Sequence, residues 1–439
     1  MTGHEKGEAS YLQHLPAVAV AARVINRLKS VIVRTARRAL IEWARGRGAL
    51  RNRGRATRPK VYFLLMHAWG MGGTIRTTLN TAAHLSQRYD VEVLGMIRTR
   101  DEPFFDFPDE VPLTPIVDGR AKARHGRLRR RLERWPSLLF PHTDPSVRVI
   151  NFWTDVQLAR VLRSRRAGVL IGTRPGLNLL AGLVAGPGMA KVGQEHMHLG
   201  NHPRKLQRAM RRGYPRLDAL AVLTEGDLRE YGELLDGSAR VEQIPNAVTA
   251  LDGGISDLTG KTVIAAGRLK HQKDFRRLIR AFAQVAERHP DWKLRICGDG
   301  PNRERLEQLI AELGVEGKVE LPGPVKNLGP ELAAASIYAL SSRREGFPMV
   351  LLEAMSKGLP VVSFDCPTGP REIVRSEENG LLVPHQDVDA LAAALNRMIE
   401  DEDLRRRCGA GALTTAERYS IEVIGARWEE LLAEVAPPT

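Results

Sequence analysis

Two glutamates eight positions apart, Glu345 and Glu353, lie in the setting that most favours ligand chemistry. Glu345 precedes, and Glu353 lies within, a segment at Met349–Met355 that the sequence predicts as a helix, because Pro348 suits a helix start and Gly358 a helix end. Amides at such a start lack partners within the helix and favour an anion. Two carboxylates would repel that anion, so we expect them to accept hydrogen bonds from hydroxyls beside it.

A phosphate between two hydroxyl-rich groups meets this requirement, and a nucleotide-diphospho-sugar is such a ligand. The residues expected to bind it here are Glu345, Gly346, Phe347, Pro348, Met349, Val350 and Glu353. The spacing alone leaves open an acidic helix start that simply faces water.

Two cations form a second candidate set. Gly267 and Arg268 follow a buried strand expected within 261–269, and Lys273 comes five residues after Arg268. Arginine offers forked hydrogen bonds and lysine a point charge, so the pair suits a diphosphate leaving group without Mg²⁺. We therefore expect no metal and no cofactor, with ordinary surface charge as the alternative. The same strand-then-glycine layout recurs before Gly298, Asp299 and Gly300.

The first half of the chain offers a glycine-rich turn and a histidine pair. Gly73 and Arg76 lie in the run AWGMGGTIR, where glycines let backbone approach a ligand and Arg76 adds charge for an anion. The spacing departs from a full dinucleotide fingerprint, so a tight turn without a ligand is the alternative. His196 and His198 end a predicted strand, at the edge of an α/β sheet where ligands bind. Of the two we favour His196.

The run EGFPMVLLEAMSKGLPVV at 345–362 resembles the donor site of retaining, nucleotide-sugar-dependent glycosyltransferases of family 4, which have the GT-B fold. Pro348 and DCPTGP at 365–370 are similar to the branch that contains poly(glycerol-phosphate) α-glucosyltransferases and capsule or teichoic-acid sugar transferases. The similarity spans roughly residues 60 to 432.

This resemblance implies roles for the candidate residues. Gly73 and Arg76 would border the acceptor and the donor phosphates, and His196 would contact the donor sugar near its reacting carbon. The loop of Arg268 and Lys273 would grip the pyrophosphate. The implied reaction moves a hexose or N-acetylhexosamine from a nucleotide-diphospho-sugar, a UDP-sugar being favoured. The acceptor would be an envelope glycan, a polyol-phosphate polymer or a lipid-linked group.

Strand and helix patterns alternate along most of the chain, which predicts an α/β fold with two Rossmann-like, doubly wound parallel sheets facing a central cleft. We expect a basic extension and linker at 1–59, an acceptor domain at 60–247, a linker at 248–259, a nucleotide-sugar domain at 260–420, and a helix at 421–439 that crosses back to the first domain. Within these domains, 102–118 is predicted as a loop and 379–384 as a hairpin-like close.

The net charge of +15 is concentrated in two segments. Residues 1–60 hold 14 Lys and Arg against three Glu, which is +11, and residues 120–134 hold eight against one Glu, which is +7. A helical pattern over 17–45 has an apolar face and a basic face, typical of an element that meets an anionic membrane surface. A helix docked on the protein is the alternative. Neither basic segment interleaves aromatic residues, so we expect no nucleic acid partner.

Composition adds expectations about compartment. Three cysteines show neither disulfide nor metal spacing, which favours a reducing compartment. No apolar run reaches the roughly 18 residues of a membrane span. We expect a cytoplasmic protein, peripheral on the inner face of the cell membrane if the basic helix binds lipid.

The same residues leave three other functions open. A two-carboxylate glycosidase would use Glu345 and Glu353 but leave the cation-rich loops unexplained. A nucleotide-sugar epimerase of similar two-domain fold would convert its donor without an acceptor. A basic membrane-binding scaffold with an inactive site would bind vesicles and consume no donor.

Overall fold

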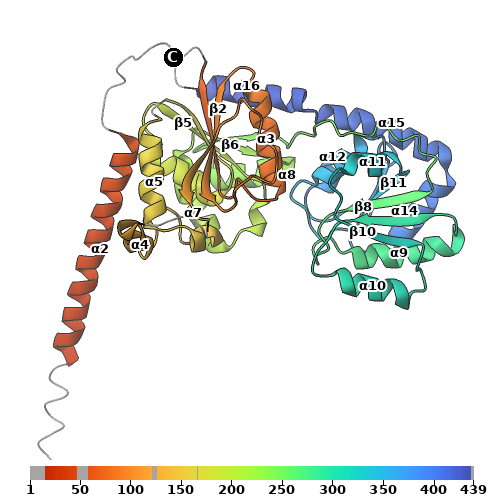
Figure 1. Ribbon diagram of the computed structural model, residues 1–439, viewed down its shortest axis with the longest axis horizontal. Helices are drawn as coiled ribbons and strands as arrows, with labels where there is room; N and C mark the ends of the chain where they lie inside the picture. The colour runs from red at the N-terminus through yellow and green to blue at the C-terminus, as the bar shows by residue number, and fades with distance from the viewer. Residues whose placement is uncertain (1–14, 47–57, 121–125, 166, 437–439) are drawn as a thin grey trace, which may run out of the picture.

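Two parallel sheets, each covered by helices, form the two domains of the chain (Figure 1). The computed structural model describes residues 15–46, 58–120, 126–165 and 167–436. Figure 1 places the first domain beside the second, with α16 running along the top of the first.

The first sheet contains seven strands in the order β3-β2-β1-β4-β5-β6-β7, all parallel. Its central strand β1 buries Val61, Phe63 and Leu65, as expected for a parallel sheet covered on both faces. The strands are β1 (Lys60–Leu65), β2 (Asp90–Arg98), β3 (Leu113–Asp118), β4 (Gly168–Gly172), β5 (Met189–Gln194), β6 (Ala219–Val222) and β7 (Arg240–Gln243). The helices are α3 (Gly73–Leu85), α4 (Arg127–Glu133), α5 (Phe152–Arg163), α6 (Pro175–Val184), α7 (Arg204–Gly213) and α8 (Glu225–Leu235), with 3₁₀ turns at Pro145–Val149, Leu199–Asn201 and Tyr214–Arg216.

The second sheet contains six parallel strands in the order β10-β9-β8-β11-β12-β13. They are β8 (Thr262–Ala266), β9 (Lys293–Cys297), β10 (Val319–Gly323), β11 (Ile337–Leu340), β12 (Val361–Phe364) and β13 (Gly380–Val383). The helices are α9 (Phe275–Arg288), α10 (Arg303–Glu312), α11 (Leu328–Ala333), α12 (Met349–Met355), α13 (Pro370–Ile373), α14 (Val388–Glu400), α15 (Glu402–Arg418) and α16 (Ile421–Val435). The predicted α/β class with two parallel sheets is confirmed.

Two local predictions are wrong, both at sheet edges. The expected loop 102–118 contains β3, which pairs with β2 at one edge of the first sheet. Pro115 argues against a strand in the sequence, because proline has no backbone N–H to donate. An edge strand tolerates proline, since one side of its backbone forms no hydrogen bonds with another strand. The expected hairpin-like close contains β13, which pairs with β12 in parallel. A parallel partner needs a crossover, here made by the loop and helix α13.

The strand order explains where ligand loops gather. In each sheet the order reverses once, between β1 and β4 in the first and between β8 and β11 in the second. Loops that leave the carboxyl ends of strands at such a point diverge and leave a crevice. The turn with Gly73 follows β1, the loop with Lys273 follows β8, and the loop with Glu345 follows β11.

The last helix joins the two domains. Helix α16 buries Ile424, Trp428 and Leu431 in the hydrophobic core of the first domain. Helix α15, directly before it, packs on α12 and α14 of the second domain. Helix α16 therefore returns to the first domain after the second (Figure 1).

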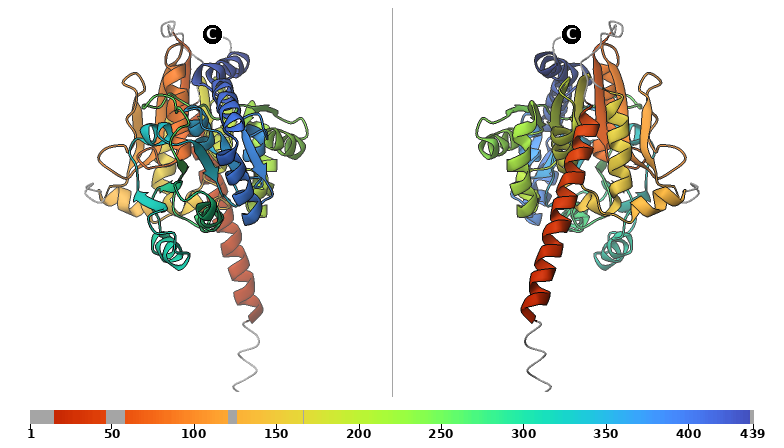
Figure 2. Two further views of the ribbon diagram at one scale, coloured as in Figure 1. Left: turned by 90° about the vertical axis from the view of Figure 1, so that its right-hand side faces the viewer. Right: turned by 90° about the vertical axis from the view of Figure 1, so that its left-hand side faces the viewer.

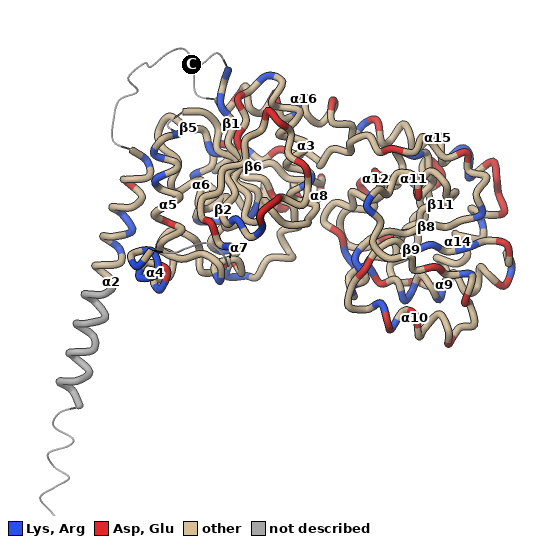
Figure 3. Tube along the Cα trace, viewed as in Figure 1, with Lys and Arg blue, Asp and Glu red and all other residues tan. Residues whose placement is uncertain are grey.

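The carboxyl end of the basic helix α2 (Leu15–Arg45) is docked on the first domain. Leu40 and Ala44 are buried against the first domain, and the Arg163 guanidinium lies 5.8 Å from the centre of the Trp43 ring. Ile32 is 66% exposed, and in both views of Figure 2 the helix extends away from the two domains. Figure 3 shows Lys and Arg along the described part of α2 and on α4 nearby. In the part of the chain that the structure describes, no helix has the length and apolar character needed to cross a membrane.

Candidate active site

The second domain forms one wall of the cleft around an ion pair. Lys273 Nζ lies 2.8 Å from Glu345 Oε1, although the two residues are 72 positions apart. Ser342 Oγ donates to the same carboxylate oxygen at 2.5 Å, and Ser341 Oγ donates to the Lys273 carbonyl at 2.9 Å. Glu345 is buried. A charge this buried requires such partners, so the predicted cation and carboxylate hold each other in place.

Backbone contacts join the two loops that carry this pair. The Arg343 amide donates to the Gln272 carbonyl at 2.8 Å, and Gln272 Nε2 donates to the Arg344 carbonyl at 3.1 Å. Gln272 and Arg344 were not predicted as site residues. The sequence pointed to both only indirectly, since Arg344 lies in the polar run at 341–345 and Gln272 directly precedes Lys273.

Glycines permit the close approach of these loops. Gly267 has φ of +151°, and a Cβ there would lie 3.0 Å from Lys273 Cε. A Cβ on Gly298 would lie 1.9 Å from the Gly267 carbonyl oxygen, and one on Gly300 would lie 2.7 Å from the Leu269 carbonyl oxygen. The predicted Gly298–Gly300 turn therefore packs directly against the Arg268–Lys273 loop. Asp299 between them is exposed, and its carbonyl accepts from the Leu269 amide at 2.9 Å.

Helix α12 has the predicted bounds, with two differences at its start. Pro348 caps the helix and is not its first residue. The Met349 amide donates to the Phe347 carbonyl at 2.9 Å, so one of the two amides expected to bind an anion already has a partner. The cause is the tight turn over Phe347 and Pro348, which places a carbonyl beside that amide. Val350 follows within the first turn of the helix.

Glu353 contacts the first domain across the cleft. Arg76 Nη1 lies 2.8 Å from Glu353 Oε1, and Arg268 Nη2 donates to the Met71 carbonyl at 3.4 Å. Burial raises the pKa of the Glu353 carboxyl, and the charges of Arg76 and Lys273 oppose that shift. The structure thus brings together Arg76, Glu353 and Arg268, which lie far apart in the sequence.

The two histidines point to different surroundings. His198 Nδ1 lies 2.9 Å from Asp227 Oδ1 and its Nε2 lies 3.1 Å from Glu230 Oε1, so its ring faces α8. His196 lines the cleft, and its buried Nε2 has no hydrogen-bond partner among the described residues. Burial lowers the pKa of the His196 imidazole to about 4, so the ring is neutral near pH 7. Of the pair, His196 is the one placed to meet a ligand in the cleft.

The domain walls nearly touch beside His196. A Cβ on Gly346 would lie 2.7 Å from the His196 carbonyl oxygen, so only glycine fits at that position without displacing backbone.

Two hollows lie between the domains, and both are lined by Gly73 and Met349. The smaller, of about 270 Å³, is lined by Gly72, Gly73, Arg76, Thr77, Asn80, Phe105, Ala247, Val248, Thr249, Arg268, Met349 and Glu353. The larger, of about 450 Å³, is lined by Gly73, Thr74, His196, Met197, Asn201, Leu223, Asn246, Gln272, Arg344, Glu345, Gly346, Phe347 and Met349. Among the predicted residues, Lys273, Gly267, Gly298, Asp299, Gly300, Pro348 and Val350 line neither hollow. Sequence analysis missed Asn246, which follows β7 and lies at the end of the expected acceptor domain 60–247.

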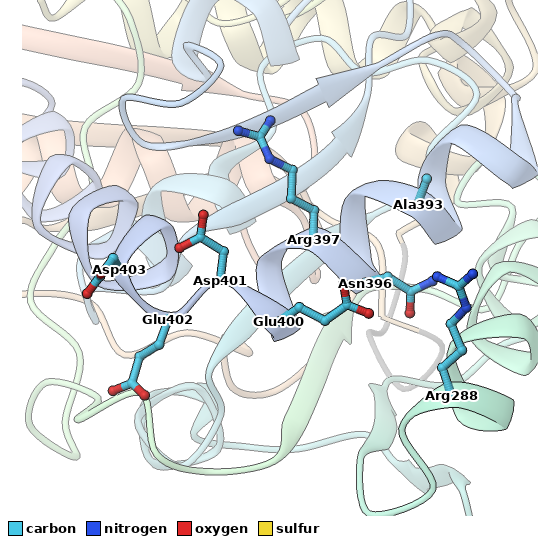
Figure 4. Close-up of a pocket in the computed structure, with 8 residues that line it drawn as sticks. All are labelled: Arg288, Ala393, Asn396, Arg397, Glu400, Asp401, Glu402 and Asp403. Carbon is cyan, nitrogen blue, oxygen red and sulfur yellow. The ribbon is translucent and has the colours of Figure 1, made fainter.

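A further hollow lies in the second domain, away from the cleft. It measures about 590 Å³ and is formed by α9, α14 and the start of α15, with Arg288, Arg397, Glu400 and Asp401 among its lining residues (Figure 4). It contains none of the predicted site residues, so size alone does not identify the site. Within the described ranges, no three His, Cys, Asp or Glu residues come together in a way that could hold a metal ion.

Comparison with known proteins identifies the second domain. Residues 254–414 match the family described as glycosyl transferases group 1, and this region carries Arg268, Lys273, Glu345 and Glu353. This domain is therefore similar to the group 1 glycosyl transferases. Together with the seven-stranded first domain it forms the GT-B fold. The region that matches this family supplies the wall of the cleft that contains the Lys273–Glu345 pair.

Relatives align with both domains. An exopolysaccharide phosphotransferase of Streptomyces coelicolor is 39% identical over 393 residues, which cover 86% of this chain and 41% of that protein. The chain thus spans less than half of that relative's length. A Campylobacter jejuni α-1,4-N-acetyl-D-galactosaminyltransferase, named for a diphospho-undecaprenol-linked glycan, is 26% identical over 83% of this chain and 96% of its own.

A solved structure shows the same fold. S. aureus TarM, crystallised with fondaparinux, alpha-GlcNAc-glycerol and UDP, has a TM-score of 0.67 at 15% identity, covering 85% of this chain and 99% of that chain. At this identity the likeness concerns the fold and not the substrate.

Proposed function

We propose that this protein is a retaining glycosyltransferase of family 4. It transfers a hexose or N-acetylhexosamine from a nucleotide-diphospho-sugar, with a UDP-sugar favoured, to an envelope polymer or a lipid-linked acceptor. The observation that carries the proposal is the buried Lys273–Glu345 pair at 2.8 Å, on the wall that faces Arg76 and His196 of the first domain.

Cations at this wall would stabilise the leaving group. Arg268 and Lys273 follow the same strand, β8, at the carboxyl edge of the sheet. A diphosphate gains negative charge as it leaves, and fixed positive charges in a site with little water stabilise such a change strongly. With two protein cations present we expect the reaction to need no metal ion.

Carboxylates would hold the hydroxyl-rich parts of the donor. Among the described residues both contacts of the Glu345 carboxylate fall on Oε1, and Oε2 would accept from a sugar hydroxyl. Glu353 would bind the ribose hydroxyls in exchange for its contact with Arg76. His196, neutral and facing the same hollow as Glu345, would support the anomeric centre.

The transfer step balances without a cofactor. The bond between the anomeric carbon and the β-phosphate oxygen breaks, and the acceptor hydroxyl oxygen bonds to that carbon on the same face. The acceptor's proton passes to the departing phosphate oxygen. One C–O bond and one O–H bond break, one of each forms, and the nucleoside diphosphate leaves.

The relatives support an envelope acceptor. The Campylobacter relative, which aligns with 83% of this chain, is named for a diphospho-undecaprenol-linked glycan. The basic segment 120–134 suits a polyanionic or lipid-linked acceptor, and its described helix α4 is exposed. We further propose that residues 17–45 bind an anionic membrane surface through the part of α2 that extends from the first domain (Figure 2).

The first experiment incubates the purified full chain with a panel of UDP- and GDP-sugars in EDTA. Teichoic-acid-like and lipid-phosphate acceptors are added, and released nucleotides are separated by chromatography. Lys273→Ala and Glu345→Ala are compared with Lys270→Ala and Glu312→Ala, matched substitutions at exposed positions. We expect acceptor-dependent release of one nucleoside diphosphate, lost in the first two variants and kept in the controls.

Other products would identify other functions. A nucleoside monophosphate would show transfer of a sugar phosphate, in line with the name of the Streptomyces relative. A changed sugar on an intact donor, formed without acceptor, would show an epimerase. If no donor is consumed or bound, the glycosyltransferase proposal fails and binding to anionic vesicles becomes the property to measure.

A further inference from the structure

Asn246 is a buried amide at the point where the chain leaves the first domain. It follows β7 and lines the larger hollow together with His196 and Glu345. Only 7% of Asn246 is exposed, and its Oδ1 has no hydrogen-bond partner among the described residues. A buried amide oxygen without a partner destabilises a folded protein, so its retention in the cleft calls for an explanation.

A second polar atom on the first domain's wall of the cleft is also buried without a hydrogen-bond partner among the described residues. His196 Nε2 is also buried and without a partner within the described part of the chain. The two atoms belong to the loop after β5 and the turn after β7, and both residues line one hollow with the Glu345 carboxylate of the opposite domain. A group bound between these walls would therefore meet hydrogen-bonding atoms from both domains.

We propose that Asn246 is a sugar-binding residue that sets donor specificity, an inference that rests on the proposed function. Its Oδ1 accepts a hydrogen bond from a hydroxyl or acetamido N–H of the transferred sugar, which Glu345 holds from the other domain. This assigns a role to a residue outside the Arg268, Lys273 and Glu345 set.

The chemistry of the hollow favours an uncharged sugar. An amide oxygen and a carboxylate both accept hydrogen bonds, so the group between them must donate. A uronate would bring a further carboxylate beside Glu345 and Asn246. Arg344 is the only lysine or arginine among the described residues that line this hollow, and it is exposed to water, which screens its charge. We therefore expect a neutral hexose or N-acetylhexosamine.

The chain provides a matched control for this assignment. Asn396 is also 7% exposed, and its Oδ1 is also buried without a partner among the described residues. It lies on α14 beside the hollow of the second domain, as Figure 4 shows, and not in the cleft. Substitution at Asn396 therefore removes an equally buried amide that lies outside the cleft.

The experiment uses the full chain and the donor that the panel identifies. Asn246→Ala and Asn246→Asp are compared with Asn396→Ala and Asn396→Asp. Turnover of the donor, affinity for the free nucleoside diphosphate by calorimetry, and thermal unfolding are measured for each. A neutral donor is also compared with a uronate donor of the same nucleotide, UDP-glucose with UDP-glucuronate or GDP-mannose with GDP-mannuronate.

We expect Asn246→Ala to lower turnover of the neutral donor by about 10- to 100-fold, the usual effect of losing one buried polar contact to a substrate. Asn246→Asp keeps an accepting oxygen at this position and should retain more of the turnover than Asn246→Ala. Affinity for the nucleoside diphosphate should stay within about twofold, since Asn246 touches the sugar and not the phosphates. The Asn396 variants should match the wild type in both measurements, and the wild type should discriminate against the uronate donor.

A folded Asn246→Ala variant that binds the nucleoside diphosphate and turns over the donor like the wild type would overturn this inference alone. Equal use of the uronate and neutral donors by the wild type would also overturn it. A wild-type protein that consumes no donor would overturn the proposed function, and with it the role of Asn246.

Discussion

The two walls of the cleft differ in how their polar groups are satisfied. On the second domain, Lys273 pairs with Glu345, and hydrogen bonds of Gln272 to the backbone of Arg343 and Arg344 join the two loops that carry this pair. On the first domain, His196 Nε2 and Asn246 Oδ1 are buried without partners among the described residues. One wall is held rigid by its own contacts, and the other presents unpaired atoms.

This difference suits the two parts of the proposed donor. A diphosphate needs fixed charges that do not reorganise as it leaves, which internal contacts around Lys273 supply. A sugar carries many hydroxyls, each able to satisfy a polar atom that the protein leaves unpaired. The wall of the second domain would accelerate departure of the diphosphate, and the wall of the first domain would recognise the sugar.

The largest expected effect is on the rigid wall. Lys273→Ala should lower kcat/KM for the donor by about 10²- to 10³-fold, because it removes a fixed charge from the leaving group and leaves Glu345 buried without its cation. Donor turnover is measured by release of nucleoside diphosphate. Lys270→Ala, in the same loop but exposed, should remain active. Equal activity of the two variants would remove the basis for assigning the leaving group to this wall.

A smaller effect is expected from the unpaired wall, and it depends on pH. The pKa of His196 is about 4 in the folded chain, against an ordinary value of 6.5. Between these values the unfolded chain binds more protons, so this group lowers the free energy of unfolding as pH falls from 6.5 towards 4. His196→Gln should remove that loss, on the order of 2 kcal/mol between pH 7.5 and 4.5.

Denaturant unfolding at both pH values measures the change, with His271→Gln at an exposed position as the control. If His196→Gln and the wild type lose stability equally on acidification, His196 is not held neutral by burial.

The smallest effect concerns the link between the walls. A double-mutant cycle with Arg76→Gln and Glu353→Gln should give a coupling of about 1 kcal/mol or less in the free energy of unfolding, since the Arg76 side chain is 41% exposed. The same double-mutant cycle can be measured on the affinity for the donor. If the bound donor replaces the contact between Arg76 and Glu353, the coupling energy should differ from the one measured by unfolding. Identical couplings with and without donor would show that the pair is structural only.

Much of the candidate site could be expected from local patterns. Glycines, cations and carboxylates that follow buried strands predict a ligand edge in any parallel sheet, and the bounds Met349–Met355 of α12 followed from Pro348 and Gly358. Asn246 and Gln272 could not be found this way, because their place in the cleft depends on the approach of segments distant in sequence. The strands β3 and β13 were missed since edge strands are short and carry weak patterns.

The sequence by itself determined the alternation of strand and helix, the concentration of basic charge in two segments, and the residue types able to bind a nucleotide-sugar. These depend on local propensity and spacing. Only the tertiary structure decided that Arg76 meets Glu353, that His196 and not His198 faces the cleft, and that Asn246 Oδ1 is buried without a partner among the described residues. Those facts depend on the packing of one domain against the other, which short-range patterns do not encode.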